Sequence, residues 1–176
     1  MRIEKVTESR STTAIYHKIA DIPAGATVKT AGFPNGGTIA EASPLYPAEN
    51  GLYNAAVSAK VVETAAADAV TYTVAKGSLL KVGDKLQKTK TVSVTITGIN
   101  TTDANKDVIT VDATLGAKNA GDAVSQFYTG EPVAITGEAV TFRKGDNVLV
   151  SAWVIAVVNK NIVPEPASKP AGVLYV

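Results

Sequence analysis

The 176-residue chain has no cysteine, and it has only one histidine, one tryptophan and one methionine. The absence of cysteine excludes disulfides, thiolate metal sites and cysteine nucleophiles. Acid–base and metal sites usually need a histidine with suitable partners, and none lies near His17 in the sequence. We therefore expect His17 to be a surface or strand-edge residue, and we expect no catalytic, cofactor-binding or metal-binding residues.

Charge is also scarce. Charged residues make up 19% of the chain, and 17 basic against 16 acidic side chains give a net charge of +1. Soluble domains average about 25% charged residues, so hydroxyl, amide and small apolar groups must cover part of the surface. A protein that binds nucleic acid needs a clear basic excess on one face. The composition argues against nucleic acid as a partner and favours contact with other protein.

Long hydrophobic runs are missing as well. The run at residues 152–158 is the longest, and it is far shorter than the ~20 residues that cross a bilayer. The first eight residues lack the apolar core of a secretion signal. We therefore expect no membrane partner, and we expect synthesis and first residence in the cytoplasm.

The chain is rich in the period-two pattern of half-buried β-strands. Val70, Tyr72 and Val74 alternate with threonines, the pattern recurs over residues 92–97, and residues 108–111 are all β-branched. Successive side chains of a strand face opposite sides of its sheet, and β-branched side chains pack well there. These segments predict strands.

Other regions carry weaker signals. A strand is expected within residues 12–19, and residues 53–69 favour strand although one helical face also fits them. Glycines and prolines are dense over residues 21–54, which excludes a long helix and predicts short strands and turns.

Two kinds of polar segment predict turns. Gly-Asp-x-apolar recurs at residues 83–86, 121–124 and 145–148, and each copy is typical of a tight turn that leads into a strand. Residues 103–107 imitate the opening of a calcium loop, but Val108 and Thr114 stand where that loop needs glycine and glutamate. A hairpin loop is the better interpretation.

Residues 148–158 are apolar on both faces, so we expect them to be covered on both sides, in a core or at a subunit contact. Trp153 lies inside this run, which favours core or interface over a sugar-binding platform. Prolines then predict an extended tail whose apolar end, residues 173–176, docks onto another surface. The candidate oligomer or capsid contact residues are Trp153, Ile155, Val157, Tyr46, Tyr53 and Tyr175.

Three segments carry a resemblance to a known family. Ile22-Pro23-Ala24-Gly25-Ala26, the stretch TYTVAKGSLLKVGD at residues 71–84, and the strand–loop–strand of residues 96–111 resemble head-fibre or capsid-decoration proteins of tailed bacteriophages and prophages. The likeness covers about residues 20–125 and is weaker towards the end, and Leu80 replaces the aromatic residue of the family pattern. The resemblance implies a β-rich, often trimeric protein on the outside of an icosahedral head, with no catalytic residues to carry over.

Together these observations predict an all-β chain with two units. A small β-barrel or sandwich at residues 57–130 is inserted into a second β-unit, formed by residues 1–56 and 131–176, which carries the oligomer or capsid contact. We predict a non-enzymatic, head-fibre-like virion protein on the capsid exterior, made in the bacterial cytoplasm. Its predicted partners are itself, as a homotrimer, the major capsid protein, and host-surface glycans.

Two alternatives remain open. A carbohydrate- or surface-binding β-module, similar to an adhesin, would place two or more tyrosines side by side on one exposed face. An enzyme built on a β-barrel would need a pocket with convergent polar groups.

Overall fold

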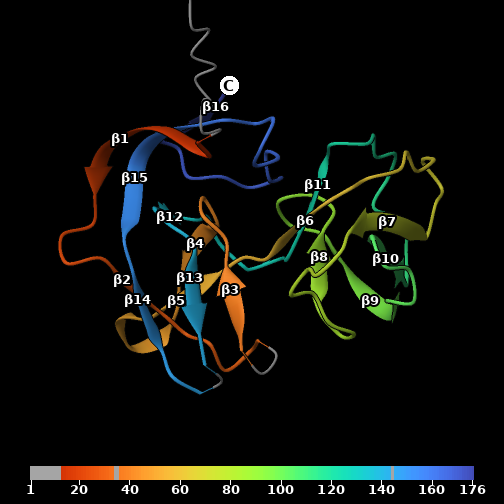
Figure 1. Cartoon of the computed structure of the whole chain (residues 1–176), viewed down its shortest axis with the longest axis horizontal. Helices are drawn as coiled ribbons and strands as arrows, with labels where there is room; N and C mark the ends of the chain where they lie inside the picture. Colours follow the sequence, from red (N-terminus) through yellow and green to blue (C-terminus); the bar gives the residue numbers. More distant parts are fainter. Residues whose placement is uncertain (1–12, 34–35, 144) are drawn as a thin grey trace, which may run out of the picture.

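The computed structural model describes residues 13–33, 36–143 and 145–176. The predicted all-β class is confirmed, with a small barrel beside a second β-unit (Figure 1). We keep the predicted boundaries as names: the inserted barrel is residues 57–130, and the terminal unit is residues 13–56 with 131–176. Residues 1–12, which the prediction gave to the terminal unit, lie outside the described residues.

The terminal unit is built on one curled sheet. Its strand order is β1-β15-β12-β4-β5-β2-β14, and β16 pairs in parallel with β15. A separate antiparallel pair joins β3 and β13, and a single 3₁₀ turn spans Glu49–Gly51. The strands are β1 (Ile15–Asp21), β2 (Ala26–Val28), β3 (Gly37–Ile39), β4 (Pro44–Pro47), β5 (Tyr53–Ala55), β12 (Ala134–Thr136), β13 (Val140–Phe142), β14 (Val148–Val150), β15 (Ala152–Val158) and β16 (Val173–Tyr175).

The inserted barrel is a ring of six strands. They are β6 (Ser58–Lys60), β7 (Thr71–Ala75), β8 (Lys85–Gln87), β9 (Ser93–Asn100), β10 (Lys106–Val111) and β11 (Ala123–Ser125). One sheet has the order β7-β10-β9-β8, and β11 pairs with β6. Single bridges at Val61–Val74 and Leu86–Gln126 join these two pieces at both seams. The ring therefore runs β6-β7-β10-β9-β8-β11 and back to β6.

The side chains that the alternating pattern assigns to one face of each strand lie in the core of the barrel. Tyr72, Val74, Ile96 and Ile109 are at most 1% exposed, while the threonines between them lie towards the outside. Burial of one such side chain contributes roughly 1.5–3 kcal/mol. The Tyr72 hydroxyl stays satisfied, because it donates to the Ala69 carbonyl at 2.8 Å and accepts from a backbone N–H. These strands are confirmed.

The Gly-Asp repeats are turns, as predicted. Gly83 and Gly121 have φ of 92° and 102°, which suits the third position of a type II turn. In each turn the aspartate also bonds back to the chain: Asp84 accepts from Lys81 N at 3.0 Å, and Asp122 accepts from Asn119 N at 2.8 Å. Gly145 has φ of 92° before β14.

Three further segments can be compared with their predicted structure. Residues 53–69 contain two short strands, β5 and β6, and no helix, so strand is the correct choice over helix there. The strand expected within residues 12–19 is β1, which begins at Ile15; Thr12 lies outside the described residues. The calcium-like segment is a β9–β10 hairpin loop in which Asp103 accepts from Asn105 N at 2.8 Å.

The chain enters and leaves the inserted barrel at adjacent points. Gln126 N donates to Val57 O at 2.8 Å, and Val57 N donates to Gln126 Oε1 at 3.1 Å. One residue further in, the Ser58 and Ser125 hydroxyls lie 2.7 Å apart. This paired neck connects the barrel to the terminal unit.

Side chains beyond the neck hold the two units together. The rings of Tyr46 and Tyr128 pack with centroids 5.3 Å apart. Gln87 of β8 donates to the buried Ser168 hydroxyl at 2.7 Å, so the segment between β15 and β16 contacts the barrel. Leu79 of the barrel packs against the terminal unit's core.

Candidate contact surface

Strand β15 presents two different faces. Ala152, Ala156 and Val158 are at most 1% exposed and lie in the terminal unit's core. On the opposite face Ile155 is 43% exposed and Val157 is half-buried. Residues 148–158 were expected to be covered on both sides, in a core or at a subunit contact, and the described residues cover only the inner face of β15. Leu149 of β14 is also exposed.

The neighbouring strands extend the outer face of β15. Val157 is in register with His17 of β1 on one side and with Leu174 of β16 on the other. Ile155 is in register with Ala20. His17 is exposed on an edge strand, as predicted.

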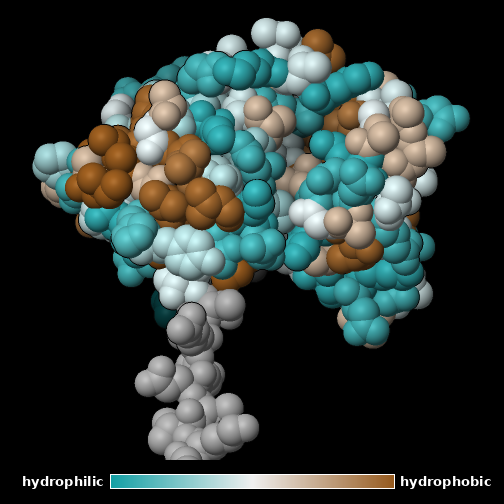
Figure 2. All heavy atoms as spheres, turned by 90° about the horizontal axis from the view of Figure 1, so that it is seen from above, coloured by the Kyte–Doolittle hydropathy of each residue, from teal (hydrophilic) through white to brown (hydrophobic). Residues whose placement is uncertain are grey.

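The exposed side chains of these three strands form a patch. Ile19 is 64% exposed, Leu174 is 56% exposed, and Tyr16 is also open to solvent. Figure 2 shows hydrophobic side chains gathered on the side of the molecule where Figure 1 places β1 and β15. We call Tyr16, His17, Ile19, Ile155, Val157 and Leu174 the outer patch.

Strand β1 is irregular where it borders β15. Its register shifts between Ile15 and His17 and again between Lys18 and Ala20, so one extra residue is inserted at each place. The extra residues are Tyr16 and Ile19, and both are exposed. A bulge re-aims side chains and interrupts the hydrogen-bond ladder, which is consistent with the exposure of these two large apolar residues on β1.

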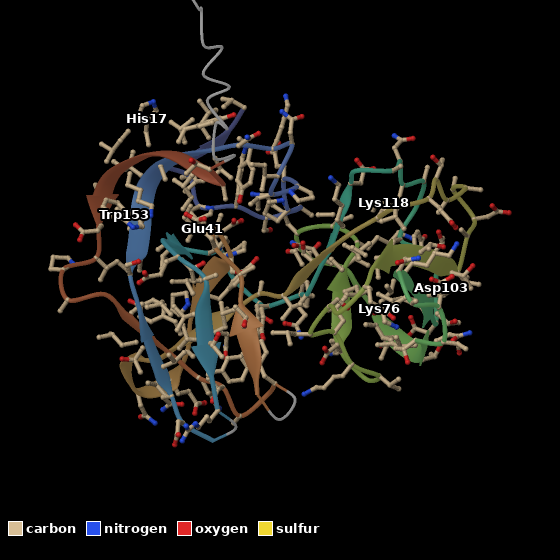
Figure 3. All side chains as sticks on the ribbon, viewed as in Figure 1. His17, Glu41, Lys76, Asp103, Lys118 and Trp153 are labelled. Carbon is tan, nitrogen blue, oxygen red and sulfur yellow. The ribbon has the colours of Figure 1, made fainter. Side chains whose placement is uncertain are left out.

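Trp153 lies at the border between this patch and the core. Its indole packs over Gly137, where a Cβ would clash with the ring. The indole N–H is buried with no hydrogen-bond partner among the described residues. The Lys18 ammonium lies 6.0 Å from the ring centroid, donates to the Gly137 carbonyl, and is 3.7 Å from a Glu41 carboxylate oxygen. Figure 3 shows His17 on the other side of β1, away from Trp153 and Glu41.

Three tyrosines were expected to contact a neighbouring subunit, and they differ in burial. Tyr46 and Tyr175 are 2% and 6% exposed, so they fill the core of a single chain and leave no side-chain surface for a neighbouring subunit. Burial raises the pKa of both phenols. Tyr53 is half-buried against the terminal unit's core. Of the six candidates, Ile155 is exposed, and Val157, Trp153 and Tyr53 keep part of their surface open.

The sequence missed Tyr16, Ile19 and Leu174 as members of the patch. The exposure of Leu174 follows from the alternation of a strand, once it is known that β16 buries Val173 and Tyr175. Tyr16 and Ile19 depend on bulges, for which the sequence of β1 carries no glycine or other marker.

One buried carboxylate of the inserted barrel has a structural role. Asp107 is buried, and its carboxylate accepts from the Lys76 ammonium at 2.8 Å and from Gly77 N at 3.1 Å. This ion pair ties the end of β7 to β10. No group of three or more His, Asp or Glu residues that could hold a metal ion occurs among the described residues.

One hollow between the two units contains four charged side chains. It has a volume of about 460 Å³ and includes Lys90, Glu131, Glu165 and Lys169. Lys90 pairs with Glu131 at 3.0 Å, and Lys169 pairs with Glu165. Opposite charges in this hollow thus bind each other instead of converging on one position.

The glycan-binding alternative required neighbouring exposed tyrosines. Tyr16 is the one aromatic residue among the large hydrophobic side chains that are exposed in the described part of the chain. Tyr128 instead packs on the buried Tyr46. The arrangement of the described tyrosines therefore does not supply the expected stacking platform.

Comparison with known proteins found no matching family model, no matching curated protein and no matching solved structure. No helix in the described ranges has the length and apolar character needed to cross a membrane.

Proposed function

We propose that this chain is a non-enzymatic virion structural protein that decorates the exterior of a tailed-phage capsid, in the manner of a head fibre. Its partners are the major capsid protein and further copies of itself, as in a homotrimer. The protein is made in the bacterial cytoplasm and ends on the assembled head.

The observation that supports this proposal is the outer patch. Tyr16, Ile19, Ile155 and Leu174 are exposed on adjacent strands of one sheet. Exposed apolar side chains that cluster instead of lying singly mark protein contact surfaces. The resemblance of residues 20–125 to phage head-fibre and decoration proteins supports the outside of a phage head as the place of this contact.

The direct test is to look for the chain in purified particles. A bacterium that carries the gene is induced, and particles are separated from unassembled protein by density-gradient centrifugation. Quantitative mass spectrometry should find the chain in the particle band at a fixed ratio to the major capsid protein. An antibody against the inserted barrel should label intact heads.

Deletion of the gene is the matching control. Heads should still assemble without the chain, and antibody labelling should disappear. The proposal is wrong if the chain is confined to the unassembled fraction of induced cultures.

A further inference from the structure

We propose that a hollow between the inserted barrel and the terminal unit binds a small carboxylic acid that carries one apolar group. This site goes beyond the proposed function, because no residue of the outer patch lines the hollow. A failure of the ligand site would leave the virion role untouched, and the reverse also holds.

The hollow has a volume of about 200 Å³, and small or apolar residues make up most of its lining. The terminal unit contributes residues 40–44, residues 162–164, Pro166 and Tyr175, and the inserted barrel contributes residues 58–60. A cavity of roughly 150 Å³ can hold a benzene ring. The size therefore suits one aromatic ring, or a short hydrocarbon chain, that ends in a polar group.

A buried hydroxyl at this hollow lacks a partner. Tyr175 lines the hollow and is 6% exposed, and its hydroxyl has no hydrogen-bond partner among the described residues. Buried polar groups are nearly always bonded, and an unpaired one costs free energy. Because burial raises the pKa of this phenol, the hydroxyl keeps its proton and is a donor. A ligand that brings an acceptor atom would satisfy it.

The wall beside Tyr175 can move without breaking backbone hydrogen bonds. Val163 packs against the core cluster that includes Tyr175, and the Lys169 ammonium lies 5.6 Å from the centroid of the tyrosine ring. Within the described part of the chain, residues 164–169 make no backbone–backbone hydrogen bond. A ligand can therefore displace this segment slightly and reach the hydroxyl. The segment's one carboxylate, on Glu165, pairs with Lys169, which reduces its repulsion of a bound acid.

A lysine at the hollow selects a carboxylate as the polar end of the ligand. Ser58 and Lys60 line the hollow from one face of β6, whereas Ala59 between them lies in the barrel core. Lys60 forms no salt bridge with any described residue. The other charged residue of the lining, Glu41, is already 3.7 Å from the Lys18 ammonium. The charge left without a partner is therefore positive, and hydrogen bonds to a carboxylate are stronger than those to a neutral acceptor.

The first experiment asks which polar end the hollow prefers. Phenylpropanoate, phenylpropanol and phenylpropylamine share one ring and chain and differ at that end, and octanoate replaces the ring by a longer chain. Each is titrated into the full chain and followed by two-dimensional amide NMR. Phenylpropanoate should shift signals of the residues that line the hollow and bind about tenfold more tightly than the alcohol, and the amine should bind more weakly still. No shift with either acid at millimolar concentration, or equal binding of the alcohol, would overturn the proposal.

The second experiment assigns the contacts. Tyr175→Phe removes only the hydroxyl and should weaken phenylpropanoate binding about tenfold. Lys60→Gln should weaken it about two- to fivefold, as expected for an exposed charge. The matched control is Lys88→Gln, because Lys88 is an exposed lysine of the inserted barrel that does not line the hollow. It should leave the affinity unchanged. Unaltered affinity in both Tyr175→Phe and Lys60→Gln would show that the acid binds elsewhere.

Stability without ligand gives a third readout. Because the Tyr175 hydroxyl has no partner among the described residues, its removal in Tyr175→Phe should not lower the free energy of unfolding. Urea unfolding of the variant and of the unmodified chain makes the comparison. A clear loss of stability would mean that the hydroxyl is bonded within the fold, and it would overturn the role of this group in ligand binding.

Discussion

At the scale of single residues, the tyrosines show how burial changes the chemistry of a side chain. Tyr128 packs on Tyr46 in the junction of the two units. Burial, with a smaller contribution from the Asp84 carboxylate, raises the pKa of Tyr128 to about 12. The phenolate is disfavoured there because it loses its hydration and faces a negative charge.

This shift predicts a dependence of stability on alkaline pH. The unfolded chain loses the Tyr128 proton near pH 10, whereas the folded chain keeps it to about pH 12. Between these values the unfolded state binds fewer protons, so the free energy of unfolding falls as pH rises. Urea unfolding at several pH values from 8 to about 11.5 should show a shallower fall for Tyr128→Phe, by up to about 1.4 kcal/mol per pH unit.

Tyr16→Phe is the matched control, since Tyr16 is exposed on β1 and is not part of the packed pair Tyr46 and Tyr128. Its stability should follow that of the unmodified chain across the whole pH range. Identical slopes for Tyr128→Phe and the unmodified chain would contradict the prediction.

At the scale of the strands, alternation explains which elements the sequence could predict. Tyr72, Val74, Ile96 and Ile109 are buried in strands that the period-two pattern located. The docking of the apolar C-terminal tetrapeptide was also predictable, and it occurs as β16 on β15. Short strands such as β3 and β13 were not, because three residues contain too little periodicity.

The contact surface was only partly predictable for the same reason. Ile155 and Val157 lie in a strand whose residues are all apolar, so the sequence located the strand but gave no sign of which face stays exposed. The burial of Tyr46 could not be read from the sequence, since it depends on Tyr128, which lies 82 positions away and reaches it through the fold. Pairing over such a distance leaves no local signal.

In strand β16, neighbouring side chains alternate between buried and exposed, and substitutions can test this difference. Tyr175 is 6% exposed and Leu174 is 56% exposed. Tyr175→Ala should lower the free energy of unfolding by about 3 kcal/mol, because truncation of a buried aromatic residue leaves a cavity. Leu174→Ala should change it by less than about 0.5 kcal/mol. Urea unfolding of dilute protein, where one copy predominates, makes the comparison; equal costs would show that β16 is not paired in this register.

At the scale of the whole molecule, the inserted barrel has a core of its own. Its buried hydrophobic residues lie between Ala59 and Val124, and they form one cluster that includes Tyr72 and Ile109. The cores of the terminal unit draw on residues before and after the barrel. Contacts such as Gln87–Ser168 join the two units at their surfaces.

A separate barrel core predicts that the barrel folds alone. A fragment of residues 57–128 should show a single cooperative thermal transition and the circular dichroism of β-structure. Its melting temperature should lie below that of the full chain, because Tyr128 and Leu79 lose their partners in the terminal unit. The control is the same fragment with Ile109→Asp, which places a charge in the core and should abolish the transition. A fragment that unfolds without cooperativity would contradict the prediction.

The paired neck also imposes an order on folding. Val57 and Gln126 are 69 positions apart in the chain, yet their backbones are bonded to each other. Until the barrel forms, strands β5 and β12 are ends of a long flexible loop whose closure is entropically costly. Once it has formed, its two ends lie side by side, and the terminal unit can assemble as though the insertion were a short connection. We therefore expect a newly made chain to complete its middle before its two ends, so that β1, β15 and the outer patch appear last, when the subunit is otherwise finished.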